Sequence, residues 1–372
     1  MTEFVPVNEP VLGGNEGRYL QECVDTGWIS SEGPFVQRLE TELAAVCDRG
    51  HGIAVANGTA ALEVAVAALE IGPGDEVILP SFTIISCAGA VVRAGATPVV
   101  IDSEPDTWNM DVTQIEAKIT LRTKAIMAVH TFGLPVDVDP LLVIAERYGL
   151  YVIEDAAELI GQTYRERPCG SFGHISTFSF YPNKHITTGE GGMVLTDDDA
   201  LAEHCRQLRN LCFQTGKRFV HNELGWNYRL SNLQAAVGVA QLERLVKSVE
   251  KKRQIGAKYA NMLSMFQGLQ LPLAQNQNAT NIYWVFGIVL DDSIPFDAEE
   301  AMQRLARLGI GTRPFFWPMH EQPVFRRMGL FHGERLPVSE RLGRRGFYIP
   351  SGLALTDSQI DKVVDAMREV FS

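Results

Sequence analysis

The sequence has no apolar run that approaches the roughly 20 residues of a membrane-spanning helix. Its start, MTEFVPVNEP, lacks both the basic stretch and the apolar core of a secretory signal. The six cysteines are scattered and form no C-x-x-C pair. We therefore expect reduced thiols in a cytoplasmic protein rather than a disulfide framework, and no association with a membrane.

Positive charge is also scarce, because 33 Lys and Arg stand against 45 Asp and Glu, for a net charge of −12. This balance argues against a nucleic-acid-binding protein, although local positive charge can still hold a small anion. No G-x-G-x-x-G motif opens the first strand–helix turn, which argues against a Rossmann dehydrogenase. His51, His130, His174, His185 and His320 have no metal-ligand spacing, so we expect no metal site.

Short β-rich runs alternate with helical stretches between residues 50 and 200. This alternation predicts an α/β fold with a mostly parallel mixed sheet covered on both faces by helices such as Ala60–Leu69 and Pro140–Tyr148. The expected strands are Gly52–Ala56, Glu76–Pro80, Thr97–Ile101, Ala125–Val129, Tyr151–Glu154, Ser176–Tyr181 and Met193–Thr196.

A long helical pattern follows from Leu230 to about Met265, interrupted only by Gly238 and Gly256, and we expect it to link two domains. Beyond it, a strand, a helix and a final helix indicate a smaller α+β domain. The final helix begins at a capping-box pattern of Thr356 and Gln359. We therefore predict a large domain of residues 1–245 and a small domain of residues 246–372. The strand and helix expected before the final helix are Ile282–Leu290 and Ala298–Leu308.

Two strand ends carry polar residues that suit a phosphorylated cofactor. Asn57, Gly58 and Thr59 follow a strand and open a helix, where free N–H groups can hold a phosphate, although this motif taken alone favours an ordinary helix cap. Asp155 ends another apolar strand, where its carboxylate could pair with a protonated pyridine nitrogen or simply cap a helix. Ligands bind at such carboxyl ends of strands in open α/β sheets.

The most specific stretch runs from Ser176 to Gly192, where a β-rich segment ends in Lys184, a polar turn and three glycines. A lysine in a partly desolvated pocket has a depressed pKa and becomes a nucleophile toward an aldehyde. A surface lysine beside a hairpin turn is the alternative. Two further segments, Gly225–Arg229 and Thr312–His320, place an arginine beside aromatic residues, which suits an anionic ligand with ring faces.

With these motifs the chain resembles, nearly from end to end, the sugar-nucleotide aminotransferases of the DegT/DnrJ/EryC1/StrS family, of aspartate-aminotransferase fold type I. The segments Trp28–Ser31 and Ile186–Met193 resemble most closely the members that aminate the 4-keto carbon of a GDP-linked 6-deoxyhexose. The resemblance implies pyridoxal phosphate as cofactor, with a pyridoxamine phosphate form. It also implies L-glutamate as amino donor and a nucleotide-linked keto-sugar as acceptor.

The resemblance also assigns roles to residues. It implies that Lys184 forms the Schiff base with the cofactor and shuttles protons, that Asp155 binds the pyridine nitrogen, and that Glu158 lies near the phenolic oxygen. Asn227 would reach the cofactor of a neighbouring subunit, so a homodimer with shared active sites is implied. Cofactor-phosphate binding falls to Gly58, Thr59 and Ser179 beside Asn57, and substrate contacts fall to Ser30, Tyr228, Arg229, Arg313 and His320.

The sequence departs from the family at the cofactor ring. Relatives place an aromatic residue after Pro-Ser-x-Thr to stack on the ring, whereas Ile84 stands at that position here. An aliphatic side chain supplies dispersion but no aromatic stacking, so either the ring is held less tightly or Phe82 or another aromatic compensates.

Three other hypotheses are open. UDP- or dTDP-linked sugars and 3-keto acceptors are alternative substrates. A GDP-sugar 3-dehydratase of the family has histidine in place of the lysine, so Lys184 argues against that activity. A ligand-sensing regulator of this fold usually carries a DNA-binding domain, for which the chain has no room.

Overall fold

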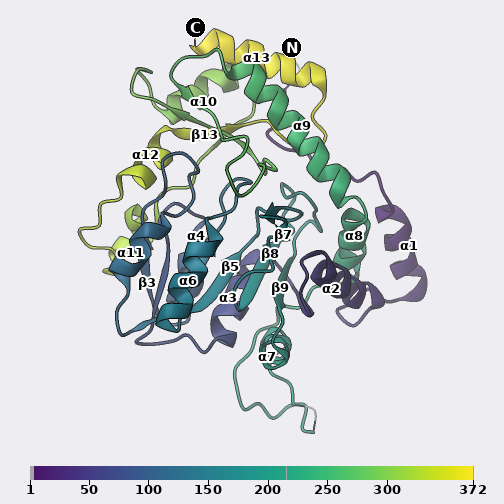
Figure 1. Cartoon of the computed structure of the whole chain (residues 1–372). Helices are drawn as coiled ribbons and strands as arrows, with labels where there is room; N and C mark the ends of the chain where they lie inside the picture. The colour runs from purple at the N-terminus through teal and green to yellow at the C-terminus, as the bar shows by residue number, and fades with distance from the viewer. Residues whose placement is uncertain (1–3, 215, 372) are drawn as a thin grey trace.

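The computed structural model describes residues 4–214 and 216–371, which form a large α/β body and a smaller unit beside it (Figure 1). A seven-stranded sheet in the order β1-β9-β8-β5-β4-β2-β3 lies at the centre of the body. Only the pairs that β9 makes are antiparallel, which confirms the predicted mostly parallel mixed sheet. The strands are β1 (His51–Val55), β2 (Glu76–Pro80), β3 (Thr97–Ile101), β4 (Thr123–Val129), β5 (Tyr151–Asp155), β8 (Ile175–Ser179) and β9 (Gly192–Thr196).

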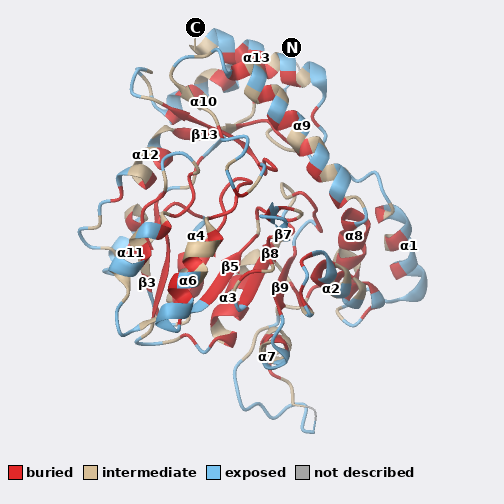
Figure 2. Cartoon of the chain, viewed as in Figure 1, coloured by how far each residue is buried: buried red, intermediate tan, exposed pale blue. Residues whose placement is uncertain are grey.

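Helices cover both faces of this sheet, so its strands are buried nearly throughout (Figure 2). In β2, Val77 and Leu79 pack into the apolar layer on one face, whereas Ile78 packs into the layer on the other face. The first layer contains α3 (Gly58–Ala68), α4 (Ile85–Arg93) and α7 (Asp199–Arg209). On the other face lie α6 (Val138–Tyr148) and, farther along the sheet, α2 (Pro34–Val46) and α8 (Asn232–Leu242).

The long helix predicted from residue 230 to 265 is in fact two helices, α8 and α9 (Leu245–Leu263). The break falls at Glu243, whose carboxylate accepts hydrogen bonds from Tyr19, Asn15 and Arg38 and so holds the chain against α1 (Glu16–Thr26) and α2. Gly238 and Gly256 interrupt nothing. A Cβ at Gly256 would lie 2.3 Å from the ring of Tyr283, so this glycine permits close packing inside the helix.

The smaller unit has a four-stranded sheet in the order β10-β11-β13-β12, packed against α9 and two further helices. Thr356 and Gln359 exchange side-chain and backbone hydrogen bonds, so the predicted capping box is present. The elements of this unit are β10 (Leu269–Gln270), β11 (Phe286–Leu290), α10 (Ala298–Arg307), β12 (Arg313–Pro314), β13 (Gly346–Ile349) and α13 (Asp357–Phe371). The remaining short elements are η1 (Val112–Gln114), α5 (Ile115–Lys118), β6 (Thr163–Tyr164), β7 (Arg167–Pro168), η2 (Met319–Glu321), α11 (Pro323–Arg327) and α12 (Pro337–Arg345).

Two contacts bear on how the units are divided and joined. Near the start of the chain, the backbone of Val5 hydrogen-bonds to Gly309 and Gly311, so this segment packs with the smaller unit. At the end of β3, the carboxylate of Asp102 accepts the N–H groups of Val338 and Ser339 at the beginning of α12. The division at residues 245 and 246 remains a proposal. Within the described residues, no helix is both long and apolar enough to cross a membrane.

Candidate active site

A cavity of about 620 Å³ opens where β1, β2, β4, β5 and β8 end. The segments that follow these five strands supply most of its lining, and the smaller unit adds Trp284, Phe316 and Tyr348. The predicted motifs therefore meet at one edge of the sheet, because the carboxyl ends of strands that run in the same direction share that edge.

Lys184 lies in the turn after β8, where its backbone N–H donates to the carbonyl of Tyr181. Its side chain is only 9% exposed, and its Nζ lies 3.9 Å from Oε1 of Glu158. The same Nζ lies 3.8 Å from the ring centroid of Trp284. Burial lowers the pKa of Lys184, and the carboxylates of Glu158 and Asp155 oppose this shift. The result is an amine that is held in place and loses its proton more readily than an exposed lysine.

Glu158 follows β5 and is held by one strong contact, since its Oε2 accepts the backbone N–H of Phe132 at 2.8 Å. Burial raises the pKa of Glu158 to about 8, against the lowering effect of Lys184. Near neutral pH this side chain can therefore carry a proton and donate it to an oxygen in the cavity.

Asp155 is the last residue of β5 and is buried. Among the described residues, one carboxylate oxygen accepts the N–H of Ala157 at 3.1 Å and the hydroxyl of Thr177 at 3.5 Å, and the other accepts the thiol of Cys87 at 3.3 Å. A thiol is a weak donor, and burial raises the pKa of Asp155, so the carboxylate is poorly compensated. A protonated ring nitrogen in the cavity would supply the missing positive partner.

The beginning of α3 forms the opposite wall of the cavity. Asn57 accepts the N–H of Ala60 with its side chain, so it is a helix N-cap, and the first amides of the helix have no partner within it. A Cβ at Gly58 would lie 2.7 Å from Cβ of Ser179, so only glycine brings the helix this close to β8. The hydroxyls of Thr59 and Ser179 lie beside these amides on the cavity wall, and this combination suits a phosphate group.

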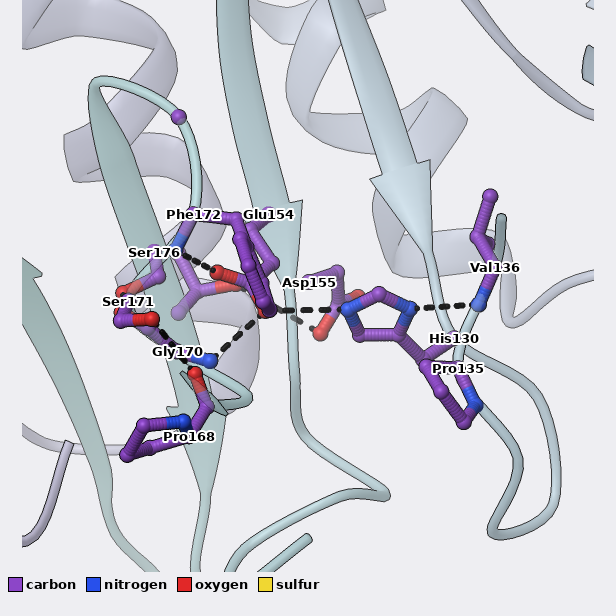
Figure 3. Close-up of polar contacts among 12 residues, drawn as sticks. His130, Pro135, Val136, Glu154, Asp155, Pro168, Gly170, Ser171, Phe172 and Ser176 are labelled. Carbon is purple, nitrogen blue, oxygen red and sulfur yellow. Dashed lines mark hydrogen bonds and ion pairs between the residues drawn. The ribbon is translucent and has the colours of Figure 1, made fainter. Parts of the chain in front are cut away.

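A buried polar network surrounds Glu154, the residue before Asp155 in β5 (Figure 3). Glu154 accepts hydrogen bonds from the N–H groups of Gly170 and Phe172 and from Nε2 of His130. Since Nδ1 of His130 accepts the N–H of Val136, the ring proton resides on Nε2 and points at Glu154. The network ties the ends of β4 and β5 to the loop before β8. Sequence reasoning missed it, and the only local signal was a carboxylate inside an apolar strand.

Ile84 lines the cavity and is 42% exposed, and its position beside the cofactor ring stays a prediction. Phe82 cannot compensate for the missing aromatic, because it is fully buried in a cluster with Phe132 and Phe315. The large aromatic beside Lys184 is Trp284 instead, and the sequence indicated only that this residue belongs to a strand.

The residues predicted to contact substrate are not all brought together. Tyr228 lines the cavity, and its hydroxyl donates to Glu63 at 2.6 Å. His320 is buried away from the cavity, between the hydroxyl of Ser81 and the carboxylate of Glu340. The residues outside the lining of the cavity are Ser30, Asn227, Arg229, Arg313 and His320, of which Ser30, Asn227 and Arg313 are exposed.

A buried lysine, a poorly compensated carboxylate and a helix N-terminus thus converge on the edge of a seven-stranded mixed sheet. They match the three parts of pyridoxal phosphate, namely its aldehyde, its ring nitrogen and its phosphate. The fold and the site together define the class of protein, a pyridoxal-phosphate-dependent aminotransferase of fold type I.

Comparison with known proteins specifies the family within this class. Residues 10–368 match the model of the DegT/DnrJ/EryC1/StrS aminotransferase family, and the chain belongs to that family. It is 42% identical over 366 residues to a GDP-perosamine synthase of Caulobacter vibrioides, covering 98% of both chains. A GDP-perosamine synthase of Vibrio cholerae is 39% identical, covering 99% of this chain and 100% of the relative. The solved structure of S. venezuelae DesV matches with a TM-score of 0.91 at 33% identity, covering 99% of this chain and 98% of that one.

Proposed function

We propose that the protein transfers an amino group from L-glutamate to the 4-keto carbon of a GDP-linked 4-keto-6-deoxyhexose. The observation that carries the chemistry is the buried amine of Lys184, held between Glu158 and Trp284 in the cavity that Asp155 faces. Similarity to two GDP-perosamine synthases over nearly the whole chain supports the choice of sugar.

Lys184, Asp155, Glu158 and the start of α3 each have a definite task in this proposal. When bound, pyridoxal phosphate supplies a carbonyl that takes up the amino group and a ring that accepts the electron pair of the broken bond. Lys184 holds the cofactor covalently and moves a proton to and from the reacting carbon. Asp155 keeps the proton on the ring nitrogen, and Glu158 hydrogen-bonds the ring oxygen. The amides at the start of α3, with Thr59 and Ser179, bind the phosphate.

We also propose a homodimer in which each cavity is completed by the partner subunit. Asn227 and Ser30 are exposed and lie outside the cavity of their own chain. Near Asn227, the loop after α7 exposes Phe219 and Leu224, at 81% and 90%, and projects from the body (Figure 2). Apolar side chains this exposed are typical of an interface with another chain. A cytoplasmic location remains a proposal supported by the six unpaired thiols.

The dimer is tested by light scattering and by mixing two inactive variants. Lys184→Ala removes the amine from the cavity of the subunit that carries it. Asn227→Asp places a negative charge beside the cofactor phosphate that the neighbouring subunit binds. Hybrid dimers contain one site with both native residues, so co-expression should restore activity that neither variant has alone. Activity that does not return in a verified hybrid would refute shared sites.

The activity is tested first by the absorbance spectrum of the purified protein with pyridoxal phosphate, before and after adding L-glutamate. A visible band that glutamate abolishes, and that Lys184→Ala lacks, is expected for a lysine-linked cofactor acting in transamination. Absence of the band refutes the cofactor assignment. A band that glutamate does not change refutes glutamate as donor.

The acceptor is then identified with nitrogen-15 glutamate and a panel of keto-sugars linked to GDP, dTDP or UDP. Mass spectrometry should find the label in the GDP-linked 4-amino sugar. Label in a 3-amino sugar or in a dTDP- or UDP-linked product would contradict the proposed substrate but not the transamination. A dehydrated product without nitrogen would instead indicate a lyase.

A further inference from the structure

The ring of Trp284 lies against the amine of Lys184, although this residue comes from the smaller unit, just before β11. Its indole face lies 3.8 Å from Nζ, a separation at which an ammonium is attracted to the ring. The side chain of Lys184 also approaches Glu158, but at 3.9 Å and without a hydrogen bond. The lysine amine therefore lies against the indole face of Trp284 and near the carboxylate of Glu158.

Two hydrogen bonds hold Trp284, one at its indole ring and one at its backbone. Its Nε1 donates to the carbonyl of Asn183, the residue next to Lys184, at 2.9 Å. The backbone carbonyl of Trp284 accepts a hydrogen bond of 2.7 Å from Nζ of Lys252. The ring is thus tied to the turn that carries the lysine, and the backbone of the same residue is tied to the core of the smaller unit.

Lys252 is an unusual lysine, because it lies on α9 with only 2% of its surface exposed. The acceptors of its two hydrogen bonds are backbone carbonyls and not carboxylates. Its ammonium group donates to the carbonyls of Trp284 and Ser351, each at 2.7 Å. Burial and the nearby charge of Lys184 lower the pKa of Lys252 to about 7. Burying an amine away from water costs free energy. The two hydrogen bonds that Lys252 makes in return link the backbone of Trp284 to that of Ser351.

We propose that Trp284 is a positioning residue for Lys184, whose amine its indole face holds in the cavity, and that Lys252 positions Trp284. The inference rests on the proposed role of Lys184 as the cofactor-linked lysine. It adds that the smaller unit, through Trp284, contributes directly to the reactivity of that lysine.

A matched pair of variants, Trp284→Phe and Trp284→Leu, tests the contact in cofactor-free protein. Both lose the hydrogen bond to Asn183 and fill much of the space, but only phenylalanine keeps an aromatic face. The readout is the rate at which Lys184 reacts with formaldehyde and borohydride, followed by peptide mass spectrometry. Without the ring, less of the amine is held as ammonium, so Lys184 in the Leu variant should react about fivefold faster than in the Phe variant. Equal rates in the two variants would overturn the proposal.

Lys252→Met tests the second contact. Lys258→Met on the same helix is its control, because the ammonium of Lys258 pairs with Asp357 and Asp361 and not with Trp284. We expect faster modification of Lys184 in Lys252→Met and the wild-type rate in Lys258→Met, with thermal unfolding used to verify that both are folded. A folded Lys252→Met protein with the wild-type rate would refute the role of Lys252. If Lys252→Met does not fold, the Trp284 pair still decides the proposal. Because no measurement uses a sugar or the bound cofactor, failure of the proposed transamination leaves these results interpretable.

Discussion

At the scale of single residues, the chemistry of the site depends on groups whose charge is set by burial. Glu158 and Lys184 face each other across 3.9 Å, and burial raises the pKa of the first and lowers that of the second. Both shifts favour neutral groups, so a proton can pass within the cavity at little cost.

The raised pKa of Glu158 predicts how stability changes with pH. The folded protein holds this proton more tightly than the unfolded chain, so its contribution is complete below the ordinary value of 4.5. It is lost as the pH rises toward about 8. Glu158→Gln does not titrate, so we expect the stability of the wild type relative to this variant to fall by about 1 kcal/mol or more over that window. Chemical denaturation of cofactor-free protein at several pH values measures this, and parallel pH curves would contradict it.

A second prediction concerns the close approach at Gly58. A methyl group there would lie 2.7 Å from Cβ of Ser179 and would push α3 away from β8. Gly58→Ala should therefore weaken cofactor binding by about tenfold, roughly the 1.4 kcal/mol of one lost hydrogen bond to a charged phosphate. Fluorescence titration with pyridoxal phosphate measures the affinity. Gly17→Ala is the control, because nothing lies within 4 Å of a Cβ there, and unaltered affinity in Gly58→Ala would argue against a phosphate at this helix.

The cavity residues that could be predicted are those whose neighbours in the sequence form a recognisable pattern. Asp155 ends an apolar run, and Lys184 stands between a β-rich run and a glycine-rich turn, so the edge of the sheet brings them together. Cys87 and Trp284 were not foreseen, since each contacts its partner across a long stretch of sequence and has no unusual neighbours. Apolar or weakly polar residues in regular elements are normally core, and the sequence alone does not distinguish the exceptions.

At the scale of helices and strands, the network of Glu154 joins three segments that no local preference would align. Its carboxylate accepts three N–H groups, from Gly170, Phe172 and His130. Glu154→Gln would place an amide among these donors and leave at least one of them without an acceptor. We expect a loss of about 2 kcal/mol of unfolding free energy in urea. Glu146→Gln on the exposed side of α6 should have no effect, and equal stability of the two variants would refute the structural role of the network.

The strands were predictable because their residues are apolar on both faces, so a continuous apolar run of five residues indicates a covered strand. The helix boundary at Glu243 could not be predicted from the sequence, because side chains of α1 and α2 determine it. Helix propensity favours continuing through this position, and long-range hydrogen bonds outweigh it.

At the scale of the whole molecule, Asp102 connects the large body to the smaller unit. It accepts the first N–H groups of α12, as an N-cap residue does, but from a position 236 and 237 residues away in the chain. Asp102→Ala should lower the free energy of unfolding by about 1 kcal/mol or more. It should also raise the exchange rate of the α12 amides in hydrogen-exchange measurements. Asp106→Ala, a few residues away and exposed, serves as control; unchanged exchange in α12 would contradict the connection.

The pairing of Val5 with residues 309 and 311 has a consequence for how the protein is made. On the ribosome, the segment that contains Val5 is synthesised well before residues 309 and 311, with which it pairs. The sheet of the large body can assemble while translation continues, but the pairing of Val5 with the smaller unit must wait until residues 309 and 311 have been synthesised. Until then the segment that contains Val5 and the apolar face of α9 are without their final partners. This is the interval in which their apolar side chains are most available to a chaperone.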